Sequence, residues 1–109
     1  MTNYLFIEAR DPFASRDTEF LEQTATALKL RGHPVTVFLV QNGVLAARTN
    51  GRDSYLSRLA AAGVMVLADD FSLSERGIKT GDLQPGIQPS GIETLVDALI
   101  EQNTRAIWH

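Results

Sequence analysis

The chain has 109 residues, of which 44% are hydrophobic, with a formal net charge of −3 and no cysteine. This length and composition predict one compact domain over residues 1–109 with a modest core. The acidic balance and the scattered Lys and Arg residues argue against a nucleic-acid partner, because phosphate binding needs clustered positive charge. The lack of cysteine excludes disulfides, thiolate nucleophiles, cysteine-ligated zinc and persulfide carriage on this chain.

The hydropathy of the chain predicts no membrane partner. No apolar run reaches the roughly 18 residues that a membrane-spanning helix needs. The first residues, MTNYLFIEARD, have neither a basic leader nor a cleavage-type site. We therefore expect a cytoplasmic protein.

The first half of the chain predicts strands separated by a helix. Residues 3–9 (NYLFIEA) form a short apolar run typical of a strand. A helix with Ser15 or Asp17 as its N-cap follows, and its apolar residues recur at helical spacing: Phe20, Leu21, Ala25 and Leu28. Residues 35–41 (VTVFLVQ) are almost continuously apolar, which indicates a strand buried on both faces of a parallel sheet.

The second half of the chain continues the alternation. We expect a helix capped by Asp53, a third buried strand over residues 64–67, a very short strand around Ile87 and a last strand over 105–109. Ser72-x-x-Glu75 and Ser90-x-x-Glu93 both fit capping boxes. The last helix has a clear amphipathic stripe, which we expect to be core together with the Ile107-Trp108 pair: Ile92, Leu95, Val96, Leu99 and Ile100. The alternative for Trp108 is that it covers a contact between subunits.

Because strand and helix alternate throughout, the sequence predicts a three-layer α/β sandwich with a mainly parallel sheet of four to five strands. The carboxyl ends of parallel strands share one edge, where ligands gather. The residues expected to bind there follow the first three strands: Glu8, Arg10, Asn42, Gly43, Asp69 and Asp70.

Two adjacent aspartates, Asp69 and Asp70, follow the third strand. Together with Glu8 or Asp11 they could form a cluster of carboxylates of the kind that holds Mg²⁺, or a carboxylate pair that performs acid–base chemistry. Neighbouring strand residues point to opposite sides, so the simpler expectation is that one aspartate caps the next turn and the other is solvated. A phosphorelay receiver domain is not favoured. In a receiver the pair of acidic residues follows the first strand and a lysine follows a later strand, whereas here the pair follows the third strand and no lysine follows the later strands. We therefore predict no metal site.

The two histidines do not assemble a catalytic site in the predicted fold. His33 lies at the amino edge, where a structural role near a helix carboxyl end is expected. His109 is on the carboxyl edge, but a single imidazole makes neither a triad nor a metal site. Phosphate-cradling glycine motifs are also missing. The sequence therefore predicts no catalytic residue and no cofactor.

Four short stretches of the sequence are similar to a known family: YLFIEARDPF, RGHPVTVFLVQNGVLAAR, AAGVMVLADDFSLSERGI and RAIWH. Together they resemble the DsrE/DsrF/DsrH-like sulfur relay family over most of the chain. The resemblance implies a small α/β subunit of a dimer, trimer or hexamer that hands persulfide sulfur between partner proteins. In sulfur-carrying members a cysteine lies just past the third strand, and aligning the later Arg-Gly turn with Arg76-Gly77 places that cysteine on or beside Asp69.

A carboxylate cannot hold a transferable sulfur atom, so the family's transfer step does not carry over to Asp69. We therefore predict a non-catalytic DsrE-like subunit or binding module, accessory to intracellular sulfur relay and unable to carry persulfide itself. The expected partners are further copies of the chain and a sulfur-relay protein. The alternative is a small enzyme, or a metal- or small-ligand-binding protein, that uses the acidic site at the carboxyl ends of the strands.

Overall fold

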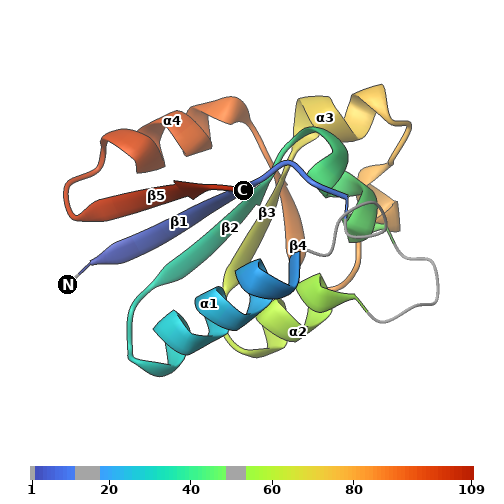
Figure 1. Cartoon of the computed structure of the whole chain (residues 1–109). Helices are drawn as coiled ribbons and strands as arrows, with labels where there is room; N and C mark the ends of the chain where they lie inside the picture. The colour runs from blue at the N-terminus through green and yellow to red at the C-terminus, as the bar shows by residue number, and fades with distance from the viewer. Residues whose placement is uncertain (1, 12–17, 49–53) are drawn as a thin grey trace.

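The computed structural model describes residues 2–11, 18–48 and 54–109. Five parallel strands form its sheet: β1 (Asn3–Glu8), β2 (Val35–Leu39), β3 (Met65–Asp69), β4 (Ile87–Ser90) and β5 (Thr104–Trp108). Their order is β4-β3-β2-β1-β5, so the last strand returns to lie beside the first (Figure 1). The α/β fold with a parallel sheet is confirmed, including the very short strand at Ile87.

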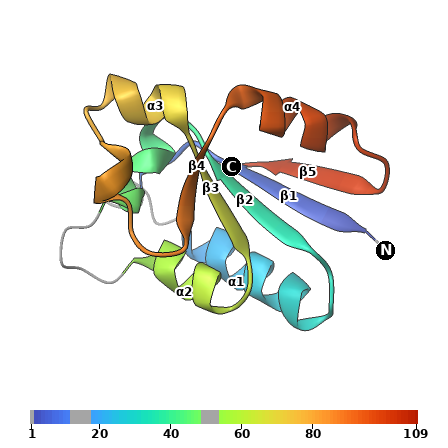
Figure 2. The same ribbon diagram turned by 180° about the vertical axis from the view of Figure 1, so that it is seen from behind.

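Helices lie on both faces of the sheet. One face is covered by α1 (Thr18–Leu30) and α2 (Tyr55–Ala61), and the other carries α3 (Asp70–Glu75) and α4 (Ile92–Ile100), as Figures 1 and 2 show from opposite sides. Two short 3-10 helices, η1 (Gln41–Ala47) and η2 (Thr80–Asp82), complete the elements. Within the described ranges, no helix combines the length and the apolar character needed to span a bilayer.

Two unequal cores fill the space on either side of the sheet. The larger lies against α1 and α2, where Phe6 of β1 packs with Leu21 and Leu56. The smaller lies against α4 and has five buried members: Leu5, Ile7, Phe38, Leu67 and Leu95. Successive residues of the central strands alternate between the two cores, which explains why these strands are apolar almost without interruption.

The expectation that the α4 stripe is core is wrong for the single chain. Only Leu95 is buried, whereas the other four members of the stripe are 41% to 76% exposed: Ile92, Val96, Leu99 and Ile100. Trp108 is 67% exposed, although Ile107 does pack against the larger core. Helical periodicity identifies an apolar face of a helix but does not show what covers that face. In the single chain, the smaller core buries only Leu95 of the α4 stripe. Phe20 of the predicted α1 stripe is likewise exposed.

The start of α2 differs by one residue from the prediction. Ser54 is the N-cap, and its Oγ accepts hydrogen bonds from the amides of Leu56 and Ser57 at 3.1 and 3.4 Å. Asp53, together with the proposed α1 caps Ser15 and Asp17, lies outside the described residues. Serine is about as good an N-cap as aspartate, which explains why Ser54 can take the position predicted for Asp53.

Both predicted capping boxes are wrong. Ser90 is still paired with Asp69 as the last residue of β4, so α4 begins instead after Gly91, which makes no side-chain cap bond. Ser72 lies inside α3, because Asp69 caps that helix three residues earlier. In each case the strand end determines where the next helix begins.

Candidate functional site

Asp69 ends β3 and begins α3. Its Oδ2 accepts a hydrogen bond from the Ser72 backbone N–H at 3.0 Å and another from the Ser72 hydroxyl at 2.7 Å. The Asp69 side chain is buried, while Asp70, the first residue of the helix, is exposed. The structure therefore confirms that one aspartate caps the turn and the other faces solvent.

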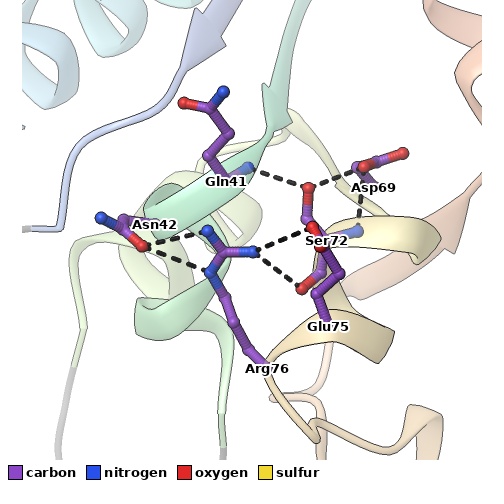
Figure 3. Close-up of polar contacts among 6 residues, drawn as sticks. All are labelled: Gln41, Asn42, Asp69, Ser72, Glu75 and Arg76. Carbon is purple, nitrogen blue, oxygen red and sulfur yellow. Dashed lines mark hydrogen bonds and ion pairs between the residues drawn. The ribbon is translucent and has the colours of Figure 1, made fainter.

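Polar contacts join the start of η1, which follows β2, to α3, as Figure 3 shows. The Ser72 Oγ accepts a hydrogen bond from the Gln41 backbone N–H at 2.9 Å. Arg76, at the end of α3, donates from Nε and Nη2 to Asn42 Oδ1 at 3.3 and 3.1 Å, and from Nη1 to the Ser72 carbonyl oxygen at 3.3 Å. Asn42 and Asp69 are thus brought to one edge of the sheet, as predicted.

Gly43 lies against the end of β1. A Cβ added at this residue would collide with the carbonyl oxygen of Glu8, so the close approach needs glycine. The same Glu8 oxygen accepts a hydrogen bond from the Val40 N–H at 2.9 Å. The glycine therefore lets η1 pack directly onto the backbone that leaves Glu8.

Glu8 forms a separate cluster on the other side of the sheet. Its fully buried side chain shares the face of Phe6, toward α1 and α2, whereas Asp69 shares the face of Leu67, toward α3. The predicted set therefore shares one edge but not one pocket. Arg10 is exposed beyond β1, and its backbone N–H donates to Glu8 Oε1 at 3.1 Å.

His109 completes this second cluster. Its Nδ1 lies 2.6 Å from Glu8 Oε2, and the Phe20 ring of α1 stacks on the imidazole with centroids 5.9 Å apart and an interplanar angle of 28°. Burial raises the pKa of Glu8, against the lowering effects of His109 and Arg10. Sequence reasoning placed His109 at this edge but missed the pair, because the contact depends on β5 entering the sheet beside β1.

The two clusters differ in what they leave available for chemistry. In the Asp69 cluster the capping oxygen, the serine hydroxyl and the arginine are all engaged within the chain. Within the described parts of the chain, no three His, Cys, Asp or Glu side chains gather into a group that could hold a metal ion. The Glu8–His109 pair, by contrast, uses one of the two imidazole nitrogens for its contact.

Comparison with known proteins gives a family and a fold. The model of the DsrE/DsrF-like family matches residues 2–107. The YchN protein from E. coli has a similar structure, with a TM-score of 0.83 and 18% identity over the whole of both chains. MTH1491 from Methanobacterium thermoautotrophicum, a protein of unknown function, gives a TM-score of 0.79 and 23% identity, again over both whole chains. No curated protein matches the chain.

Proposed function

Since this chain belongs to the DsrE/DsrF-like family, we propose that it is a non-catalytic subunit, accessory to intracellular sulfur relay, that binds partner chains in the cytoplasm and carries no persulfide. The observation that carries the proposal is the absence of cysteine from the 109 residues. Sulfur transfer proceeds through a thiolate that forms and breaks a sulfur–sulfur bond. The two methionines have thioethers, which cannot form that bond reversibly.

The place of the missing thiol supports the same function. The family resemblance puts the sulfur-carrying position on or beside Asp69. At that position a buried carboxylate begins α3 and accepts both hydrogen bonds from Ser72. An edge that serves sulfur transfer in other members has a structural role here, which favours a binding subunit over an enzyme that uses an acidic site.

The exposed residues of this edge are our candidates for contact with a sulfur-relay protein. Arg10, Asn42 and Asp70 are exposed, and Phe71, which follows Asp70 in α3, is 66% exposed. An exposed aromatic side chain is a common anchor in protein interfaces. The buried residues Glu8, Gly43 and Asp69 are assigned the role of shaping the edge.

Self-association of the chain, as a dimer, trimer or hexamer, is the second part of the proposal. Four apolar side chains of α4 are exposed, and Trp108 lies on the same side of the sheet, because it pairs in register with Ile7 of the smaller core. An exposed apolar patch of this kind marks an interaction surface. Covering it with a second copy would complete the smaller core.

Sulfur carriage is tested by exposing the purified chain to polysulfide and measuring its intact mass. We expect no gain of a sulfur atom. The variant Asp70→Cys is the matched control, because it places one exposed thiol at the same edge and leaves the Asp69 cap in place. The control must gain sulfur; a wild-type chain that gains sulfur and passes it on would overturn the proposal.

Self-association is tested by light scattering coupled to size-exclusion chromatography. We expect the wild type to be larger than a monomer at micromolar concentration and Val96→Asp to dissociate. Thr94→Asp adds the same charge to an exposed position of α4 outside the apolar stripe, and this variant is expected to stay assembled. A monomeric wild type, or equal effects of the two substitutions, would contradict this part of the proposal.

A further inference from the structure

The Glu8–His109 pair is a part-buried side-chain contact that uses one of the two imidazole nitrogens. Glu8 is 0% exposed, and each of its oxygens has a contact, Oε2 with His109 Nδ1 and Oε1 with the Arg10 amide. The His109 side chain retains 13% of its surface exposed. Among the described residues, the hydrogen-bond contact of the His109 ring is the one from Nδ1 to Glu8, and Nε2 has no partner there.

The surroundings of the pair match those of an acid–base site. It lies at the carboxyl edge of a parallel sheet, next to the first turn of α1, where ligands of such folds bind. A carboxylate on Nδ1 fixes the imidazole tautomer, so that Nε2 carries the free electron pair. Phe20, stacked on the ring and 57% exposed, adds an apolar surface beside it.

An unpaired hydroxyl in the same region is an independent observation. Tyr55, at the start of α2, has a buried hydroxyl without a hydrogen-bond partner among the described residues. Burial raises its pKa, and the charges of Glu8, Glu22 and Asp11 raise it further, with Glu8 contributing most among them. A buried polar group without a partner is costly and rare unless a ligand or water completes it.

Stability alone does not account for the pair. Taking a carboxylate out of water is costly, and a hydrogen-bond partner offsets this cost only in part, so apolar residues of similar volume would be at least as stable here. Ile107 and Phe6, the residues two positions earlier on the same two strands, are apolar and paired in register. The Glu8–His109 contact follows this apolar pair at the carboxyl edge of the sheet.

We propose that Glu8 and His109 form a proton-acceptor site for a thiol of a partner molecule, with His109 as the base and Glu8 as its positioning residue. The choice of a thiol over other weak acids rests on the proposed function. Two properties of thiols support this choice. An ordinary thiol has a pKa of about 8.5 and an ordinary imidazole one of about 6.5, and these values are close enough for a proton to pass between them near neutral pH. Sulfur also packs favourably against an aromatic ring such as Phe20.

The proposed step is a simple proton transfer. The S–H bond breaks and both of its electrons stay on sulfur, while the proton forms a new N–H bond at Nε2 of His109. The products are a thiolate and an imidazolium, and the Glu8 carboxylate balances the positive charge of the imidazolium. The chain would in this way take up the proton of a partner's thiol without carrying sulfur itself, and the sulfur-transfer step would remain with the partner.

The tautomer of His109 is the first test, by nitrogen-15 NMR of the full chain. Only two histidines are present, so His33→Gln assigns the signals. We expect His109 to be protonated at Nδ1 and free at Nε2 near pH 8, and Glu8→Leu to abolish that preference. Added 2-mercaptoethanol should shift the Nε2 signal, whereas ethylene glycol, its oxygen counterpart, should not. An Nε2-protonated tautomer, or equal shifts with both probes, would overturn the proposal.

A thiol placed beside the imidazole gives the second test. Because the chain has no other cysteine, the ultraviolet absorbance of the thiolate reports one site in Phe20→Cys. We expect about tenfold more thiolate at pH 7 in Phe20→Cys than in Phe20→Cys combined with His109→Gln, which corresponds to a pKa lowered by about one unit. Both variants hold the thiol in the first turn of α1, so the helix dipole acts equally on them. His33→Gln is the matched control and should leave the thiolate fraction of Phe20→Cys unchanged. Equal thiolate fractions with and without His109, or the same loss on adding His33→Gln, would overturn the inference.

The two tests separate this inference from the proposed function. Uptake of sulfur by the wild type would remove the proposed function without altering the tautomer or the thiolate fraction. Failure of either His109 test, with no sulfur uptake and an assembled chain, would remove only the proton-acceptor site.

Discussion

Replacing Asp69 by alanine tests whether this residue is a helix cap, and its effect can be estimated from the contacts of Ser72. Loss of the cap bond to the Ser72 amide costs about 1 kcal/mol. The Ser72 hydroxyl is buried and would lose its acceptor, which costs a further 1–2 kcal/mol or so. Asp69→Ala should therefore lower the free energy of unfolding by about 2–3 kcal/mol.

This loss is large relative to the roughly 5–15 kcal/mol total of a small domain. In thermal unfolding it corresponds to a Tm lower by about 10 °C for a chain of this size. The assay is urea unfolding followed by circular dichroism at pH 7. The midpoint should fall while the slope with urea stays constant, because the substitution removes a local contact and leaves the surface exposed on unfolding nearly unchanged.

Two matched variants show whether the cap is responsible. Asp70→Ala removes the neighbouring exposed carboxylate and should cost only about 0.5 kcal/mol, from its interaction with the helix dipole. Asp69→Asn retains a capping oxygen and should recover most of the loss. Equal losses at residues 69 and 70, or a loss below about 0.5 kcal/mol in Asp69→Ala, would refute the assignment of Asp69 as a buried cap.

Three further predictions concern the same edge. Gly43→Ala should destabilise the chain by at least about 2 kcal/mol in urea unfolding because of the collision with the Glu8 carbonyl oxygen, whereas Gly81→Ala, which meets no atom, should be tolerated. Burial raises the pKa of Glu8 in the folded chain above its usual 4.5, so the free energy of unfolding of the wild type should fall as the pH rises from 4.5 through the pKa of the folded state. Glu8→Gln should remove this pH dependence, which is measured from urea midpoints at several pH values in that range. Arg76→Ala, which breaks exposed bonds to Asn42, should cost less than about 1 kcal/mol in the same assay, and a larger loss would mean that this contact holds η1 in place.

The fold was predictable because its signals are local. The continuous apolar run at residues 35–41 indicates a strand buried on both faces, and β2 is the middle strand of the sheet. Glycines at the ends of apolar stripes, such as Gly32 and Gly63, both with φ near 90°, marked where helices end. The position of Asp69 and Asp70 after β3 followed from the same alternation.

Features that depend on distant parts of the chain were not predictable in the same way. Periodicity showed that α4 has an apolar face, but whether Val96 is covered depends on the strand order and on other molecules. The contact between Glu8 and His109 joins residues 101 positions apart, and no spacing in the sequence specifies that β5 pairs with β1. The sequence indicated only that both residues end strands at the same edge.

The strand order has a mechanical consequence. Because β4 and β5 are the two outer strands, the short segment between them has to cross the full width of the sheet, roughly 19 Å for four strand spacings. That segment comprises residues 91–103, and its helix α4 runs alongside β5 and packs against it (Figure 1). Detachment of β4 from β3 would therefore leave α4 and β5 together, so that the amide hydrogens of β4 should exchange with solvent independently of those of β5.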